Sequence, residues 1–215
     1  MVQCSCPAAP SLTTIPAFSC GENFGQIQKL AFQRLYDASG NLNSFTEAEI
    51  KVLTNWTSKM TVTSPADLNT KIVVTPFVEA PTQEGGDAIT FGGGNETLGG
   101  VEETVGRSGS TITFALRKFP QSIIKALKAL QCETNLGVFL FSENGAIEAI
   151  KGGTTEAPTY SPIPIRSLFV GDKIHGGLEE PDSNELRFAF LPNYSDDLAV
   201  VVPDFNPLTQ LVVSE

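Results

Sequence analysis

The sequence predicts a mainly β protein, with a β-sandwich or barrel-like fold, one flanking α-helix, a second short helix and a long glycine-rich loop. Several short segments either alternate between apolar and polar residues or are apolar over the length of a strand, and turn residues separate them. One segment, residues 120–132, carries a clear helical stripe. With 215 residues, 41% hydrophobic and 18% charged, the chain is expected to fold as a single domain over residues 1–215.

The first quarter of the chain is expected to hold an irregular arm, a strand and a short helix. Residues 1–23 contain three prolines among small polar residues and show no periodicity, so they predict an arm that needs contacts to be ordered. Residues 26–35 favour a strand, although a helical face also fits them, because a turn signal follows at 38–41. Thr46 and Glu49 form a capping box, which predicts a helix over about 47–57.

The middle of the chain contains its most unusual segment. Residues 71–79 are rich in β-forming residues, but Pro76 cannot donate a backbone hydrogen bond, which indicates an edge strand. Residues 80–106 then hold eight of the 19 glycines and few core-forming residues. A loop of this length in a compact domain is normally functional or disordered, so we expect an extended loop over residues 80–107.

The remaining elements follow from clear patterns. Residues 110–118 alternate as a strand, and Pro120 then begins a helix whose apolar stripe reaches Cys132. Residues 136–142 and 146–150 flank an Asn-Gly turn, which is typical of a β-hairpin. Further strands are expected near residues 163–170, 185–191 and 198–202.

The balance of charge argues against a protein that reads DNA sequence. The 14 basic and 24 acidic residues give a net charge of −10, which repels phosphate. Residues 104–131 hold five basic residues and no acidic one, which leaves −15 on the rest of the chain. Two explanations of this basic segment are equally good. It is either an ordinary solvated helix face or a basic edge that meets the acidic surface of a neighbouring subunit. The basic residues are Arg107, Arg117, Lys118, Lys125 and Lys128.

No motif predicts a catalytic, cofactor or metal site. Gly94 and Gly99 have the spacing of a phosphate-binding loop, but Gly and Val follow where that motif needs Lys and Ser or Thr. The single histidine, His175, has no nucleophile motif around it and is expected at a turn or on the surface. The acidic residues at 179–185 do not match a calcium-binding loop. We therefore expect a protein that is not an enzyme and that needs no cofactor.

The four cysteines are expected to be thiols in a reducing compartment. A metal site made of Cys4, Cys6 and Cys20 is disfavoured, because their spacing lacks the paired pattern of zinc sites. Only three residues precede Cys4, and no apolar run approaches 18 residues, so we expect synthesis in a cytosol and no membrane insertion. The fourth cysteine, Cys132, closes the predicted helix.

A strand, a helix and a strand in succession carry a resemblance to a known family. The segment ITFALRKFPQSIIKALKALQCETNLGVFLF, residues 112–141, follows the long glycine loop, and the stretches PIPIRSLFVGDK and LAVVVPDFNPLTQL make the last third β-rich. Over residues 24–211, this order of elements resembles the bacteriophage tail tube (major tail) protein family.

The resemblance implies a β-sandwich with a helix on its flank and six subunits in a ring. Such rings stack through a long loop and the terminal arms into a tube that conducts DNA to the host. The subunit would be a structural protein of the virion tail, made in the host cytoplasm, with other copies of itself and other tail proteins as partners. DNA would pass an acidic bore without specific binding. The residues expected at the subunit interface are Gly85, Gly92, Gly93, Gly94, Glu96, Gly99, Gly100, Arg107, Lys125 and Lys128.

Two alternatives remain open at this point. A capsid decoration or head–tail connector protein would have the same β-rich core but a finite stoichiometry. A monomeric β-sandwich that binds glycans or a cell surface belongs to a different class, but one Trp and three Tyr offer few aromatic side chains for stacking on sugars. Open-ended polymerisation of the purified chain would separate the tail tube from both.

Overall fold

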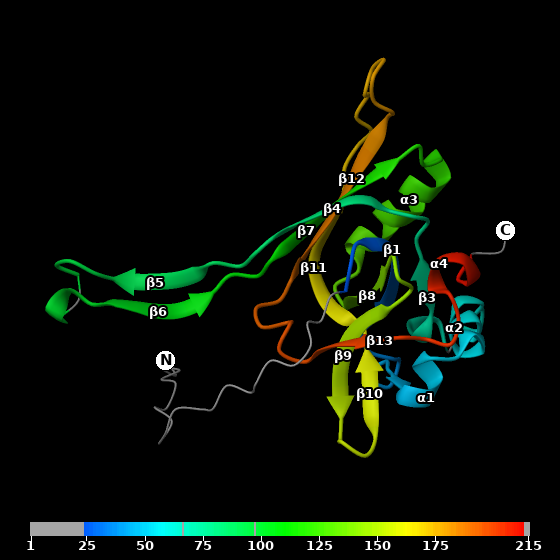
Figure 1. Ribbon diagram of the computed structural model, residues 1–215, viewed down its shortest axis with the longest axis horizontal. Coiled ribbons are helices and arrows are strands. Elements are labelled where there is room, and N and C mark those ends of the chain that lie inside the picture. Colours follow the sequence, from blue (N-terminus) through cyan, green and yellow to red (C-terminus); the bar gives the residue numbers. More distant parts are fainter. Residues whose placement is uncertain (1–23, 66, 97, 213–215) are drawn as a thin grey trace.

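A computed structural model describes residues 24–65, 67–96 and 98–212 of the chain. Within these residues the fold is mainly β, as the sequence predicts. A curled antiparallel sheet of 11 strands forms a half-barrel, and a second sheet of two strands projects from it (Figure 1). The arm predicted over residues 1–23, with Cys4, Cys6 and Cys20, lies outside the described residues.

The strands of the main sheet are β1 (Ile27–Arg34), β2 (Phe45–Thr46), β3 (Ile72–Val74), β4 (Glu79–Glu84), β7 (Thr111–Arg117), β8 (Leu136–Ser142), β9 (Ile147–Gly153), β10 (Pro158–Ser161), β11 (Ile163–Val170), β12 (Ser183–Phe190) and β13 (Leu198–Val201). They run in the order β2–β10–β9–β8–β11–β12–β7–β4, while β1 pairs with β8 and β3, and β13 pairs with β9. The predicted hairpin is present as β8 and β9, and the strand predicted over residues 163–170 matches β11.

Strands β1 and β8 lie at the centre of the fold and are buried on both faces. Successive residues of a strand point to opposite sides of its sheet. Val138 therefore joins one hydrophobic cluster and Phe139 the other, and Leu30 and Ala31 of β1 divide in the same way. The run over residues 136–141 is continuously apolar because neither face of β8 meets water.

Helices cover both faces of the sheet. On one side α3 (Gln121–Ala129) buries Ile124 and Leu127 against the first cluster and continues into a 3₁₀ turn (Leu130–Cys132), which confirms the helix predicted over residues 120–132. On the other side the second cluster includes Ile50, Trp56 and Leu208. These side chains belong to α1 (Glu47–Ile50), α2 (Leu53–Met60) and α4 (Pro207–Gln210), respectively. The described chain also contains two further 3₁₀ turns, Leu68–Thr70 and Leu98–Gly100.

The helix predicted over residues 47–57 is divided into α1 and α2. The capping box is present, since the N–H of Glu49 donates to the Thr46 hydroxyl at 3.3 Å and the Glu49 carboxylate accepts from the N–H of Thr46 at 2.8 Å. The chain leaves helical geometry at Val52, where φ is −107° and ψ is 122°. This break lets the indole N–H of Trp56 donate to the carbonyl oxygen of Ile50 at 2.9 Å.

The strand predicted over residues 71–79 is present only in its first part. Strand β3 pairs with β1 alone among the described strands, so it occupies an edge as predicted. Pro76 lies between β3 and β4, where its missing N–H interrupts no ladder. From Glu79 onward the chain pairs with β7 instead.

A buried lysine fastens the end of the chain to β1. Lys29 is 5% exposed, and its ammonium group donates to the carbonyl oxygens of Leu208 at 3.1 Å and Leu211 at 2.6 Å. Burial lowers the pKa of the Lys29 ammonium. These two hydrogen bonds supply acceptors for a charge that would otherwise be costly to bury, and they hold α4 against the sheet.

Glu148 is a half-buried carboxyl in apolar surroundings. It lies opposite Leu140 of β8 and Val200 of β13. Burial raises the pKa of Glu148 from 4.5 to about 7. Between these two pH values the folded chain keeps the proton and the unfolded chain releases it. The contribution of Glu148 to the free energy of unfolding therefore falls as the pH rises through that window.

We expect Glu148→Gln to raise the free energy of unfolding by about 1–2 kcal/mol at pH 8, because a neutral amide avoids the cost of a buried charge. At pH 4 the carboxyl is largely protonated in both states, so the variant and the wild type should be about equally stable. Urea unfolding at both pH values, followed by circular dichroism, measures the difference. An equal gain at pH 4 and pH 8 would contradict this account of Glu148.

Candidate functional site

Residues 85–96 and 98–108 form a β-ribbon that projects from the main sheet. Strands β4 and β7 pair within that sheet, and the same two segments continue outward as β5 (Ala88–Gly92) and β6 (Glu102–Arg107). Figure 1 shows this pair extending away from the rest of the fold. The segment predicted as a loop over residues 80–107 is thus extended, as expected, but it is ordered as strands. Glycine depresses strand propensity, yet the two halves of this segment pair with each other.

The ribbon has one apolar and one polar face. Ile89 and Phe91 are two residues apart in β5 and share a face, and they are 50% and 58% exposed. Val105, the extra residue of a β-bulge opposite Ile89, is 63% exposed. On the other face the Thr90 hydroxyl donates to the Glu102 carboxylate at 2.5 Å. The apolar face is uncovered within the described part of the subunit.

Glycines occupy the base and the tip of the ribbon. A Cβ atom on Gly86 would lie 2.2 Å from the carbonyl oxygen of Ser108, so the close approach of the two strands at the base requires glycine. At the tip, Gly93 has φ of 98° and Gly99 has φ of 80°, a region that favours glycine. Of the other predicted interface glycines, Gly92, Gly94 and Gly100 also have positive φ, and Gly85 follows β4 directly.

The ribbon is acidic. Its carboxylates belong to Asp87, Glu96, Glu102 and Glu103, and Arg107 is its basic residue. All five side chains are exposed. Glu103 lies directly opposite Phe91 in the pairing of β5 with β6, so a carboxylate shares the apolar face. A partner of this face must therefore offer apolar contacts together with a positive charge or water for Glu103.

The structure does not bring Lys125 and Lys128 to the ribbon. Both belong to α3, which packs on the main sheet away from β5 and β6 (Figure 1). Lys128 forms an ion pair with Asp172, and Arg117 forms one with Glu79 at 2.7 Å. Two of the five basic residues of the segment 104–131 are thus balanced within the subunit. The predicted interface residues form two separate groups, one on the ribbon and one on α3.

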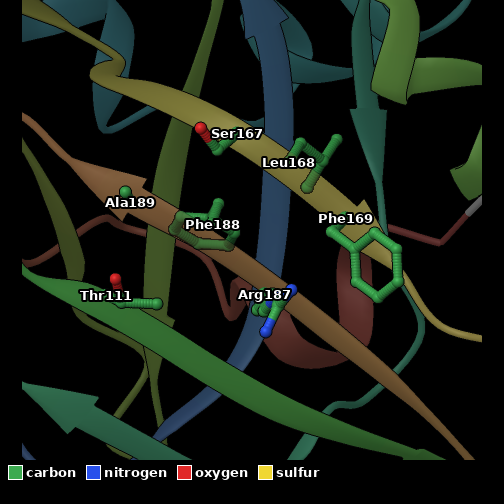
Figure 2. A pocket seen from close by; sticks show the side chains of 7 residues that line it. All are labelled: Thr111, Ser167, Leu168, Phe169, Arg187, Phe188 and Ala189. Atoms are coloured by element: carbon green, nitrogen blue, oxygen red, sulfur yellow. The ribbon is translucent and has the colours of Figure 1, made fainter.

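A shallow hollow of about 530 Å³ lies over β7, β11 and β12 (Figure 2). It forms where β11 bulges, since the pairing with β12 shifts between Arg166 and Phe169 and Ser167 has φ of 54°. The Arg187 guanidinium lies over the Phe169 ring, 4.8 Å from its centroid. The residues that line the hollow are Thr111, Ser167, Leu168, Phe169, Arg187, Phe188 and Ala189. This set has no carboxylate, imidazole or thiol, so it offers no acid–base pair.

His175 lies on the surface, as the sequence suggests. Its side chain is exposed, and its Nδ1 atom lies 3.2 Å from a carboxylate oxygen of Asp182. In the part of the chain that the structure describes, no three His, Cys, Asp or Glu side chains gather as metal ligands. No helix of the described residues is long and apolar enough to cross a membrane.

No protein-family profile matches the chain, and no curated protein or solved structure is significantly similar to it. The apolar residues of the ribbon were missed in the sequence because the glycines around them dominate the segment. The signal that could have found them is the alternation of Ile89 and Phe91 with Thr90, together with Val105 on the returning strand.

Proposed function

We propose that this protein is a structural virion subunit that closes into rings, which stack into a phage tail tube. The observation that carries the proposal is the ribbon, a two-stranded sheet whose apolar face is covered by none of the described residues of its own subunit. An isolated two-stranded hairpin is at best marginally stable in water. Contact with a neighbouring copy would supply the missing cover, as repeated assembly requires.

The remaining parts of the proposal rest on the resemblance to tail tube proteins and on charge. The resemblance supplies the ring of six, the place in the virion tail and the other tail proteins as partners. The net charge of −10 is compatible with a bore that conducts DNA, because acidic walls cannot neutralise phosphates and so would not hold them. No catalytic step and no cofactor are required for this role.

Negative-stain electron microscopy of the purified, tag-free chain at high concentration tests the proposal. We expect rings with a central hole, or tubes of variable length. Closed assemblies of one fixed size without stacking would favour a capsid decoration or head–tail connector protein. Monomers at every concentration, together with retention on a glycan array, would favour the glycan-binding class instead.

A further inference from the structure

A second apolar surface that the described residues leave uncovered lies at the other end of the fold from the ribbon. A groove of about 550 Å³ runs between α2 and β3, and Met60, Val62, Val73 and Val212 line it. Val73 is 37% exposed and Val212 is 64% exposed, although both are aliphatic. In Figure 1, α2 and β3 lie at the opposite end of the longest axis from β5 and β6. We call this surface the α2–β3 groove.

One wall of the α2–β3 groove is a sheet edge. Strand β3 pairs with β1, and no other described strand pairs with it. Its outer edge therefore presents backbone N–H and C=O groups to an incoming segment. An extended ribbon is the shape that meets such an edge best, because its own backbone can lie alongside the edge while its side chains fill the groove.

Charge complementarity selects the occupant of the α2–β3 groove. The residues that line it include one cation, Lys71, and no carboxylate. Lys71 is exposed and forms no ion pair within the described chain. The apolar face of the ribbon carries Glu103 beside Phe91. Two ribbons set face to face would bring their Glu103 carboxylates together, whereas a ribbon in this groove would place Glu103 near the ammonium group of Lys71.

We propose that the α2–β3 groove receives the ribbon of a second copy of this chain, with Phe91 in the groove and Glu103 beside Lys71. This inference rests on the proposed function and adds the receiving surface to it. Ribbon and groove are different surfaces at opposite ends of the molecule, so the contact is heterologous. Each added copy then leaves one free groove and one free ribbon, and assembly can continue.

Exchange of the two charges tests the pairing of Glu103 with Lys71. Lys71→Glu and Glu103→Lys should each raise the protein concentration needed for assembly by about tenfold, because each places like charges in contact. The double variant carries both changes in one chain and should assemble close to the wild-type concentration. Light scattering and electron microscopy measure both. A double variant as impaired as the two single changes combined would overturn the proposed pairing.

A mixing experiment tests the groove without relying on charge. The ribbonless variant, in which Asn-Gly replaces residues 88–107, keeps the groove, while Val73→Asp keeps the ribbon. We expect each to remain monomeric alone and the mixture to form a 1:1 complex, measured by size-exclusion chromatography with light scattering. Val202→Asp, a change at another exposed valine (72%), is the matched control and should assemble normally.

The outcomes separate this inference from the proposed function. If Val73→Asp assembles as readily as the wild type, the groove is not the receiving surface, while the tail tube proposal stands. If the wild type assembles but the mixture of the two variants gives no complex, the ribbon contacts another part of its neighbour and the inference is wrong. If the wild type itself never assembles and the mixture gives no complex, both proposals fail.

Discussion

The ribbonless variant, with Asn-Gly in place of residues 88–107, should fold normally and lose all assembly into rings or tubes. The N–H of Ser108 donates to the carbonyl oxygen of Asp87 at 2.8 Å, so the strands are already closed where the excision is made. Asn-Gly is the preferred connection for a two-residue hairpin. No described residue of 88–107 belongs to either hydrophobic cluster. We therefore expect a melting temperature within about 3 °C of the wild type.

A triple variant provides the matched control for this excision. Ile89→Thr, Phe91→Thr and Val105→Thr together keep the backbone pairing of the ribbon and its β-forming character, but remove most of its apolar face. If the apolar face drives assembly, the triple variant should fail as completely as the ribbonless variant when both are examined by electron microscopy. Normal tubes from the ribbonless variant would contradict the role assigned to the ribbon.

The sequence predicted the elements that bury one face against the core and turn the other face away from it. Strand β7 alternates because one face lies on the core and the other does not, and its burial follows that alternation residue by residue. Helix α3 has one buried stripe, with Ile124 and Leu127, for the same reason. In both cases the local pattern is sufficient because one face of the element is buried against the rest of the chain.

The paired strands of the ribbon and the α2–β3 groove were not predicted from the sequence, for a physical reason in each case. Among the described residues, the ribbon contributes none to either hydrophobic cluster, so only the short alternation of Ile89, Thr90 and Phe91 marks it, and the glycines around that alternation indicate a loop. The groove depends on which strand β3 pairs with and on the position of Val212, which lies far along the chain from Val73. Pairing between distant segments leaves no local trace in a single sequence. The separation of Lys125 from the ribbon has the same origin.

Trp56→Ala should be among the most destabilising single substitutions in the described chain, with a loss of about 3–5 kcal/mol in the free energy of unfolding. Trp56 is fully buried at the centre of the second cluster. Its ring stacks on Phe45 at 4.7 Å between centroids and meets the rings of Phe139 and Phe141 edge-on at 5.0 and 5.6 Å. Alanine would leave a cavity among three aromatic rings, and these rings cannot move together to fill it.

The control for this substitution is Trp56→Phe, which keeps an aromatic ring but removes the hydrogen bond to the carbonyl oxygen of Ile50. We expect it to cost about 1–2 kcal/mol, from one lost hydrogen bond and a smaller ring. Because Trp56 is the single tryptophan of the chain, urea unfolding must be followed by far-UV circular dichroism and not by fluorescence. A loss below about 1 kcal/mol for Trp56→Ala would mean that this cluster does not hold α2 to the sheet.

The same substitution connects the core to the proposed assembly. Helix α2 carries both Trp56, which faces the sheet, and Met60, which lines the α2–β3 groove. Loosening α2 should therefore damage the groove while the ribbon, whose described residues do not belong to this cluster, stays intact. If Trp56→Ala folds at low temperature, its ribbon should still bind the groove of the ribbonless variant, whereas its own groove should not accept a ribbon. That asymmetry would place the receiving surface on the α2 side of the fold by a route independent of charge.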